Sequence, residues 1–375
     1  MPIHQSKIER LIAEFCPNGV EFKELGEVLD YEQPTKYIVK STEYENIYKT
    51  PVLTAGQSFI LGYTDESNGI YKANKENPVI IFDDFTTSFH WVDFEFKVKS
   101  SAMKMLKIKK DIAVNFRFIY FAMRCIHYVP SDHARHWISQ YSTFQIPIPP
   151  LEIQQKIVNI LDKFTELETE LETELEARKK QYQYYRDELL GFEDKVEWKI
   201  LGEVCEMKAG KSISSSDISN QKNENNVYSC IGGNGSRGYV DSFSHNGKFS
   251  IIGRQGALCG NICFAEGKFY ATEHAVVVKH GDQFIARFLY HILLSMNLNQ
   301  YATGGAQPGL AVSKLEKIKI PVPTLTEQER IVKILDKFDT LVNDISIGLP
   351  AELKARRQQY EYYRNKLLTF KELQK

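Results

Sequence analysis

Cysteines are few in this chain, and long apolar runs are missing. Six cysteines scattered through 375 residues are too few for the disulfide framework of a small secreted protein. No stretch approaches the roughly 18–20 apolar residues of a membrane-spanning helix. The first residues also lack the apolar core of a signal peptide. The sequence therefore predicts a cytoplasmic protein with no membrane partner.

Signatures of an enzyme are also missing. No Gly-x-Gly-x-x-Gly joins a predicted strand to a predicted helix, and neither a Walker loop nor the Asn/Asp-Pro-Pro-aromatic motif of amino-methyltransferases occurs. The net charge is −1, so the whole chain does not attract nucleic acid. Residues 205–320 nevertheless hold twelve Lys and Arg against eight Asp and Glu, a weak indication of phosphate contact. We predict a non-catalytic chain that binds no cofactor or metal itself.

One pattern leaves an enzymatic alternative open. Asp83 and Asp84 end a predicted strand, and Glu95-Phe96-Lys97 follows. An acidic pair followed by Glu-x-Lys is the arrangement of Mg²⁺-dependent nucleases, in which carboxylates hold the metal. The second half of the chain has Gly253-Arg254 at the equivalent strand end. A nuclease that uses Asp83, Asp84, Glu95 and Lys97 is therefore the less favoured interpretation.

The most informative pattern is an internal repeat. Val20–Val28 (VEFKELGEV) returns as Val196–Val204 (VEWKILGEV), and Ile146–Pro149 returns as Ile320–Pro323. Each Pro motif precedes a long helical segment that contains Ile-Leu-Asp-Lys-Phe and ends in a Tyr-Tyr-Arg signature. The sequence predicts a globule followed by a long helix, built twice, and hence a pseudo-two-fold molecule that suits duplex DNA.

The two long segments have the spacing of amphipathic helices. Proline is tolerated in a first helical turn, and apolar residues then follow at intervals of three and four. Gly348 and Pro350 interrupt the second segment, so we predict a break near 347–351. Aromatic and leucine side chains would form the coil core and partner interface, with candidates Phe164, Leu171, Tyr182, Tyr185, Phe338, Tyr360 and Tyr363.

The remaining segments have the pattern of α/β globules. Short apolar runs such as Pro78–Phe82 and Ala275–Val278 fit buried strands, and Phe116–Cys125 fits a helix. An N-terminal helix is expected to stand beside the chain's last helix, which would close the repeat as a circular permutation. The predicted domains are 1–145 with a helix at 4–16, 146–193 as the first long helix, 194–319, and 320–375 as the second long helix.

Loops that follow the predicted strands carry residue types that read bases. Gly232–Gly238 combines glycines, which permit close backbone approach, with polar side chains and one Arg. Arg and Gln can pair bidentately with guanine and adenine edges. Each residue taken singly can also be a plain solvent-exposed loop residue. The predicted DNA-binding residues are Gln57, Ser58, Tyr63, Thr86, Thr87, Ser88, His90, Asn234, Ser236, Arg237, Tyr239, Arg254 and Gln255.

The order of these motifs resembles the specificity subunit of type I restriction-modification enzymes. The resemblance covers nearly the whole chain: Pro17-Asn18-Gly19-Val20-Glu21-Phe22, both Leu-Gly-Glu-Val copies, both Ile-Pro-x-Pro motifs and both helix ends at 174–186 and 352–364. It implies two α/β target-recognition domains separated by an antiparallel two-helix coiled coil. Each domain would read one half of a bipartite DNA site, and the helices would set the spacer between the halves.

The same resemblance implies partners and cofactors. The partners are double-stranded DNA, two methylation subunits that dock on the helices, and restriction subunits for cleavage. S-adenosylmethionine, ATP and Mg²⁺ would be bound by those subunits and not by this chain. The family's base contacts lie in variable loops, so no contact residue carries over. A coiled-coil adaptor with two ligand-binding globules and no DNA is the other alternative.

Overall fold

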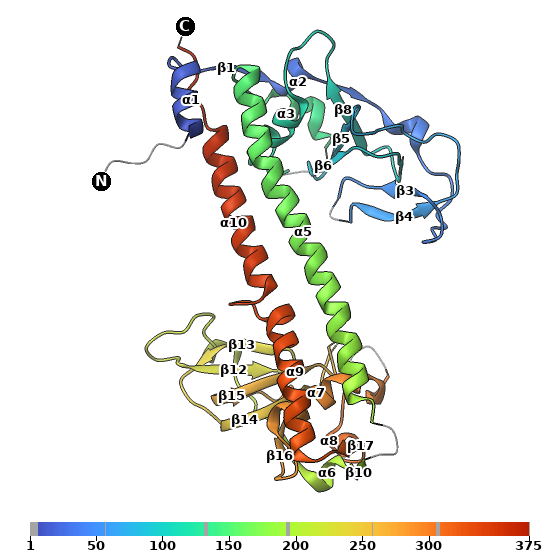
Figure 1. The fold of residues 1–375 in the computed structure, drawn as a ribbon, viewed down its shortest axis with the longest axis vertical. Helices are drawn as coiled ribbons and strands as arrows, with labels where there is room; N and C mark the ends of the chain where they lie inside the picture. The colour runs from blue at the N-terminus through green and yellow to red at the C-terminus, as the bar shows by residue number, and fades with distance from the viewer. Residues whose placement is uncertain are drawn as a thin grey trace. The chain divides into compact units, whose positions relative to one another are not determined.

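The computed structural model describes residues 7–56, 58–130, 134–192, 196–256, 258–304 and 308–374. The chain divides into two compact units, here called unit 1 (residues 1–170 and 354–375) and unit 2 (residues 171–353). Two long helices, α5 (Leu151–Leu190) and α10 (Leu349–Leu368), contribute residues to both units (Figure 1). No helix within the described residues is long and apolar enough to cross a membrane.

Unit 1 contains small sheets and short helices around the first half of α5. Its other helices are α1 (Lys7–Phe15), α2 (Leu25–Val28), α3 (Phe116–Met123) and α4 (His136–Ser139), with 3₁₀ turns η1 (Pro34–Tyr37) and η2 (Tyr141–Thr143). Its strands are β1 (Glu21–Glu24), β2 (Leu29–Glu32), β3 (Thr50–Leu53), β4 (Ile60–Thr64), β5 (Val79–Asp83), β6 (Phe89–Val92), β7 (Lys97–Val98), β8 (Met103–Ile108) and β9 (Gln145–Ile148). The sheet orders are β2-β8-β5-β6, β4-β3-β7 and β1-β9.

Unit 2 repeats this plan with one large sheet, in the order β11-β16-β14-β15-β12-β13, and a ribbon of β10 and β17. Its strands are β10 (Glu197–Ile200), β11 (Cys205–Ala209), β12 (Tyr228–Gly232), β13 (Gly235–Val240), β14 (His245–Gly253), β15 (Ile262–Ala271), β16 (Ala275–His280) and β17 (Lys319–Val322). Its helices are α6 (Leu201–Val204), α7 (Ala286–Ser295), α8 (Val312–Leu315) and α9 (Leu325–Asn343), with 3₁₀ turns η3 (Ser215–Asp217) and η4 (Leu298–Tyr301).

The repeated motifs form one structural device in each unit. The Ile-Pro-x-Pro strand pairs antiparallel with the strand before Leu-Gly-Glu-Val, so Phe22 faces Pro147 and Trp198 faces Pro321. The motif itself forms a single helical turn whose Leu25 or Leu201 is fully buried. In unit 2 its glycine is required, because a Cβ on Gly202 would approach the Glu316 Cβ to 2.9 Å. The sequence repeat therefore encodes the base from which each long helix starts.

A glutamine fixes that start in both copies. The side chain of Gln154 donates to the Pro149 carbonyl oxygen and accepts from the Asn115 backbone N–H. Gln328 makes the same two types of bond, to the Pro323 carbonyl oxygen and from the backbone N–H of Ile285. Both glutamines are almost fully buried, where each unpaired polar group would cost free energy. The long helices are thus locked to the preceding strand and to α3 or α7.

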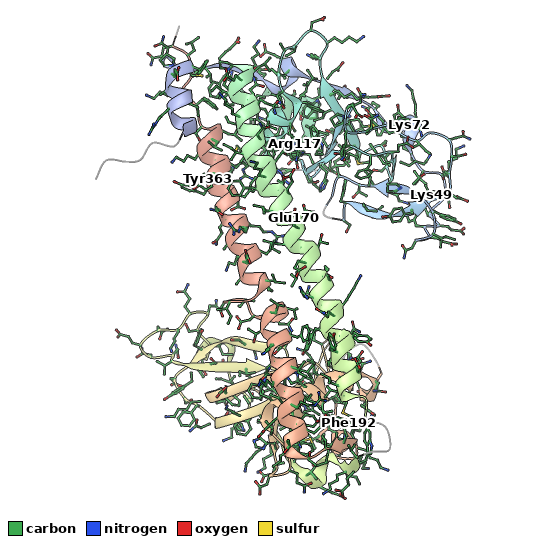
Figure 2. The ribbon with its side chains drawn as sticks, in the orientation of Figure 1. Lys49, Lys72, Arg117, Glu170, Phe192 and Tyr363 are labelled. Carbon is green, nitrogen blue, oxygen red and sulfur yellow. The ribbon has the colours of Figure 1, made fainter. Side chains whose placement is uncertain are left out.

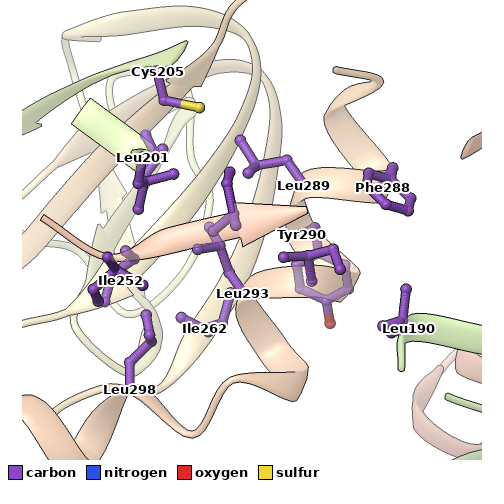
Figure 3. Close-up of a cluster of buried hydrophobic side chains, with 14 of the residues drawn as sticks. Leu190, Leu201, Cys205, Ile252, Ile262, Phe288, Leu289, Tyr290, Leu293 and Leu298 are labelled. Carbon is purple, nitrogen blue, oxygen red and sulfur yellow. The ribbon is translucent and has the colours of Figure 1, made fainter. Parts of the chain in front are cut away.

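Each unit has its own main apolar core. In unit 2, α7 lies on the sheet, and its Leu289 and Leu293 pack into the same cluster as Ile252 and Ile262 (Figure 3). Leu175 and other residues of the second half of α5 join that core. In unit 1, α3 packs in the corresponding way with β5, β8 and the first half of α5. The predicted strands at Pro78–Phe82 and Ala275–Val278 and the helix at Phe116–Cys125 are confirmed as β5, β16 and α3.

The long helices pair within each unit. In unit 1, Phe164 stacks on Tyr363 with ring centroids 5.5 Å apart, and Glu168 accepts from Arg357 at 2.6 Å. From the first contact to the second, the residue number rises in α5 and falls in α10, so these two helices are antiparallel. In unit 2, Phe338 of α9 stacks on Tyr182 and Tyr185 of α5. The predicted break is confirmed, since α9 ends at Asn343 and α10 begins at Leu349.

The two ends of the chain meet in unit 1. The backbone of Val20 accepts from the Leu373 N–H and donates to the Lys371 carbonyl oxygen. Helix α1 borders a hollow that the end of α10 also lines. The expected place of the N-terminal helix is confirmed, although the first residues predicted for it, 4–6, lie outside the described part. The domain limits at 145, 193 and 319 remain predictions.

Candidate nucleic-acid interface

The clearest candidate site in unit 2 is the tip of the β12–β13 hairpin. The tip packs directly on the backbone at the end of β14 and the start of β16: a Cβ on Gly233 would lie 2.6 Å from the His274 carbonyl oxygen, and one on Gly253 would lie 2.2 Å from the Gly233 carbonyl oxygen. Only glycine permits these approaches. They place the exposed side chains of Asn234 and Arg237 beside Gln255.

These residues surround one open hollow of about 370 Å³. It unites four predicted residues that are separate in the sequence, namely Asn234, Ser236, Arg237 and Gln255. Leu258 and His274 line the same hollow and were not among the predicted residues. A signal for His274 was present in the sequence, because this residue directly precedes the apolar run of β16. The predicted residues Arg254 and Gln255 border the apolar run of β14 in a similar way, at its other end.

Two predicted residues of unit 2 lie outside the hollow. Tyr239 is half-buried in β13, and its backbone pairs with Ser219. Arg254 is also half-buried. Its backbone N–H donates to the His274 carbonyl oxygen, and its carbonyl oxygen accepts from the Leu310 N–H. The Nε atom of Arg254 is enclosed, with no hydrogen-bond partner among the described residues. The structure therefore separates Arg254 from the lining of the hollow.

In unit 1 the corresponding loops meet in another way. The Ser88 hydroxyl donates to the Ala55 carbonyl oxygen at 2.6 Å, and His90 Nε2 lies 3.0 Å from the Gly56 carbonyl oxygen. Phe59 stacks on the His90 ring at 4.5 Å. Burial lowers the pKa of His90, more than its bonds to the 55–56 carbonyls raise it. Ser88 and His90 thus fasten the loop after β3 to the turn after β5.

The turn after β5 presents a different set of side chains. Asp83 accepts from the backbone N–H groups of Phe85 and Thr86, and Thr87 adopts a left-handed φ of 57°. A β-branched residue is strained in that region. Thr87 is nearly buried, whereas Phe85 and Thr86 are exposed at the tip. Phe85 was not among the predicted DNA-binding residues, because a sequence pattern does not distinguish an exposed aromatic side chain from a buried one.

Two further predicted residues, Ser58 and Tyr63, belong to the β3–β4 hairpin. Ser58 is exposed, and its carbonyl oxygen accepts from the Thr54 hydroxyl. Tyr63 is half-buried opposite Pro51. Gln57 lies outside the described residues. Contact of any of these side chains with DNA remains a prediction.

The nuclease arrangement is not formed. Asp84 is buried in an ion pair with Lys104, with 3.1 Å between carboxylate and ammonium. Lys97 pairs with Glu66 at 3.1 Å, and Glu95 pairs with Lys72. Asp84 and Lys97 are buried, and each has its own ion-pair partner because buried charges need compensation close by. The described residues also contain no group of three or more His, Cys, Asp or Glu placed to hold a metal ion.

The helices carry a second repeated contact set. Arg117 of α3 donates to Asp162 of α5 at 2.8 Å, and Figure 2 shows Arg117 beside that helix. Arg287 of α7 donates in the same way to Asp336 of α9 at 2.8 Å, and also to Asp339. In both units the guanidinium also lies over aromatic rings. These Arg–Asp pairs connect α3 to α5 in unit 1 and α7 to α9 in unit 2.

The predicted coil residues divide by exposure. Tyr182 and Tyr360 are buried, and Phe164, Leu171 and Phe338 are half-buried. Tyr185 and Tyr363 are both 37% exposed beside Phe338 and Phe164. The neighbouring Tyr184 and Tyr362 are 65% and 60% exposed at equivalent places in the repeat. The structure shows the aromatic coil contacts, while the partner interface remains a prediction.

A duplicated α/β unit whose two copies expose different loop side chains fits a protein that recognises two ligand segments. The family model described as type I restriction modification DNA specificity domain matches the chain twice, at residues 17–178 and 193–355. The chain therefore belongs to the family of type I restriction-modification DNA specificity subunits. Each match covers one α/β segment together with at least part of the long helix that follows it.

Individual relatives cover nearly the full chain. The specificity subunit of the type I restriction enzyme EcoR124I/EcoR124II of Escherichia coli is 43% identical over 94% of this chain and 94% of its own length. A putative specificity subunit of Haemophilus influenzae is 31% identical over 94% and 96%. The crystal structure of a type I S subunit from M. genitalium aligns with a TM-score of 0.65 at 16% identity, covering 93% and 96%. This structural likeness shows the shared fold.

Proposed function

We propose that this chain reads a bipartite, asymmetric site in double-stranded DNA, with unit 1 and unit 2 each recognising one half. The observation that carries the proposal is a constant frame with different loop chemistry. Both units repeat the ribbon, the glutamine lock and the Arg–Asp contact. Their loop ends differ, with Phe85 and Thr86 in unit 1 and Asn234, Arg237 and Gln255 in unit 2. Two units with the same framework but different loop side chains suit the recognition of two different half-sites.

The helices are proposed to dock two methylation subunits, and restriction subunits join these for cleavage. The exposed tyrosines support this part, since Tyr184 and Tyr362 are large, partly apolar and placed alike in both copies. Tyrosine is enriched at protein interfaces. One such position in each copy gives two similar docking places. The length of α5 is proposed to set the spacer between the half-sites.

Catalysis is proposed to lie entirely with those partners. S-adenosylmethionine, ATP and Mg²⁺ would bind to the methylation and restriction subunits, because the sequence holds neither an amino-methyltransferase motif nor a Walker loop, and Asp84 and Lys97 are engaged in separate ion pairs. Purified chain incubated with plasmid, Mg²⁺, ATP and S-adenosylmethionine should neither cut nor methylate it. Cleavage that disappears in Asp83→Ala or Glu95→Ala would restore the nuclease interpretation.

The test of recognition is selection from a random duplex pool. The chain, alone and with the methylation subunit of its own cell, is bound to the pool and the retained duplexes are sequenced. We expect two short specified segments separated by an unspecified gap of fixed length. Retention of all sequences equally would contradict DNA recognition and favour the adaptor, which family membership does not support.

A further inference from the structure

In the hollow of unit 2, two side-chain amides have their oxygen atoms engaged by neighbouring residues. The Asn234 side-chain oxygen accepts from the Asn261 amide at 3.0 Å. The Gln255 side-chain oxygen faces His274 Nδ1 at 2.5 Å, and since it can only accept, that nitrogen must donate. Both amide NH₂ groups are thereby turned away from these partners.

The third donor group is Arg237. Its side chain is exposed, and no described residue pairs with its guanidinium. Its stem lies on Gly232, where a Cβ would come within 2.8 Å of the Arg237 Cδ. A side chain at position 232 would therefore displace the Arg. The side chains that line the hollow thus include two amides whose oxygens are already bonded and one guanidinium.

The site is held firmly before any ligand arrives. His274 donates from Nδ1 to Gln255, and its Nε2 lies 3.3 Å from a carboxylate oxygen of Glu273. The glycine contacts between the hairpin tip and β14 fix Asn234 relative to Gln255. Pre-organised donors lose little side-chain entropy on binding and discriminate by geometry. Amides whose oxygen is already bonded no longer offer the balanced donor and acceptor pair that adenine requires.

Among base edges in the major groove, guanine alone offers two acceptors, O6 and N7, and no donor. Adenine combines N7 with an amino donor, and cytosine offers an amino donor. We propose that Asn234, Arg237 and Gln255, with His274 as the positioning residue for Gln255, form the guanine-reading site of unit 2. This inference rests on the proposed function, because it assumes that unit 2 reads a DNA half-site.

The test converts donors to acceptors without changing shape. Complexes of the full chain with its methylation subunits are offered duplexes randomised over both half-sites, and retained sequences are counted. In the wild type we expect a guanine at one or more positions of one half-site. Gln255→Glu should lower the preference for one guanine at least about fivefold, the lower end for a good base contact. The preference should move toward cytosine, whose amino group donates.

Two comparisons protect this result. Asn234→Asp makes the same exchange from the hairpin, so it should affect the same or the adjacent base pair. Gln283→Glu is the matched control, because Gln283 is exposed in the loop after β16, at the opposite end of that strand from His274, and accepts from Lys199. It should leave every preference unchanged. The half-site of unit 1 should also persist in all variants, which shows that the complex is folded and bound.

The outcomes separate the inference from the function beneath it. A wild type without any sequence preference overturns both. A bipartite preference that Gln255→Glu and Asn234→Asp leave intact overturns the guanine site alone. Equal weakening on all sequences also overturns it, since the donors would then contact phosphate.

Discussion

The two units share a frame but build different sheets on it. In unit 2 the ten residues of β15 pair with β14 at one end and with β12 at the other, so six strands form one sheet. In unit 1 the corresponding stretch is broken into β6, which pairs with β5, and β7, which pairs with β3. Residues 93–96 interrupt it, and two sheets result. The frame thus tolerates large changes in the part that carries the recognition loops.

The cores of the two sheets differ as well. Strand register places Lys104 opposite Phe82 in unit 1 and Val276 opposite Ile252 in unit 2, at equivalent positions. Lys104 is fully buried and pairs with Asp84, which also accepts from the Trp137 backbone N–H at 2.9 Å. Unit 1 therefore uses a buried ion pair to hold the end of β5, where unit 2 uses an apolar contact.

The largest effect is expected from breaking that ion pair. Asp84→Ala leaves the buried ammonium of Lys104 without compensation and should destabilise unit 1 by about 3–5 kcal/mol. Hydrogen exchange of β5 and β8 peptides, followed by mass spectrometry, measures the loss, and peptides of unit 2 serve as an internal reference.

The matched double variant makes unit 1 resemble unit 2. Asp84→Ala combined with Lys104→Met removes both charges and should recover most of the stability, because apolar replacement of a buried pair is often neutral or stabilising. If the double variant exchanges as fast as Asp84→Ala, the pair has a role other than charge compensation.

A smaller effect compares the contacts between globule and helix. Arg287 reaches two carboxylates, Asp336 and Asp339, whereas for Arg117 the described contacts include only Asp162. Arg287→Ala should cost unit 2 about 1.5–3 kcal/mol, the range for hydrogen bonds to charged groups. Arg117→Ala should cost unit 1 less. Exchange of α7 and α3 peptides measures both.

Lysine variants sharpen this comparison. Arg287→Lys keeps the charge but loses the planar fork that binds two carboxylates. It should therefore lose part of the stability in unit 2, while Arg117→Lys should be nearly neutral. Equal losses in the two units would contradict the importance of the second carboxylate.

Acid should separate the units more weakly. Burial raises the pKa of Asp336, but hydrogen bonds from His291 and Arg287 outweigh it, and the net shift is downward. A carboxyl group whose pKa is lowered by folding stabilises the folded state when the pH is above the ordinary pKa of that group. This stabilisation is lost as the pH falls toward the lowered pKa. Unit 2 should lose protection relative to unit 1 below about pH 4.

The control for the acid effect is Asp336→Asn, which should remove that additional loss and leave unit 2 less stable at neutral pH. Asp162→Asn is the matched variant in unit 1. An unchanged acid profile of unit 2 in Asp336→Asn would assign the loss to other carboxylates.

The sequence predicted the repeated features and missed those that distinguish the copies. The helix starts and the break before Leu349 follow from Pro, Gly and apolar spacing, which act locally, whereas the strand pairing of the ribbon was not predicted. The split sheet of unit 1 depends on which strands pair across long distances, and no local pattern records it. The burial of Lys104 and Lys97 was likewise hidden, because their partners Asp84 and Glu66 are recognisable only in three dimensions. The hollow could not be predicted either, because its lining combines the β12–β13 hairpin with His274, which is distant in the sequence.

The smallest expected change keeps both units and alters only the helix that belongs to both. Residues 165–176 are three identical Thr-Glu-Leu-Glu tetrads within the continuous helix α5. Deleting Thr169–Glu172 removes about 6 Å of helix at 1.5 Å per residue, and it rotates the C-terminal remainder of α5 by about 400°, a net drift of about 40°. Leu175, which is buried in unit 2, then stays close to its original face.

Both half-sites should therefore persist while the gap between them shortens by one or two base pairs, since 6 Å corresponds to at most about two steps of 3.4 Å. Libraries with fixed half-sites and varied gap length measure the preferred spacer of wild type and deletion. A deletion that still binds both half-sites at the original spacing would show that α5 does not set the distance. Loss of one half-site would instead show that the two units depend on each other for recognition, against the independence that their separate cores support.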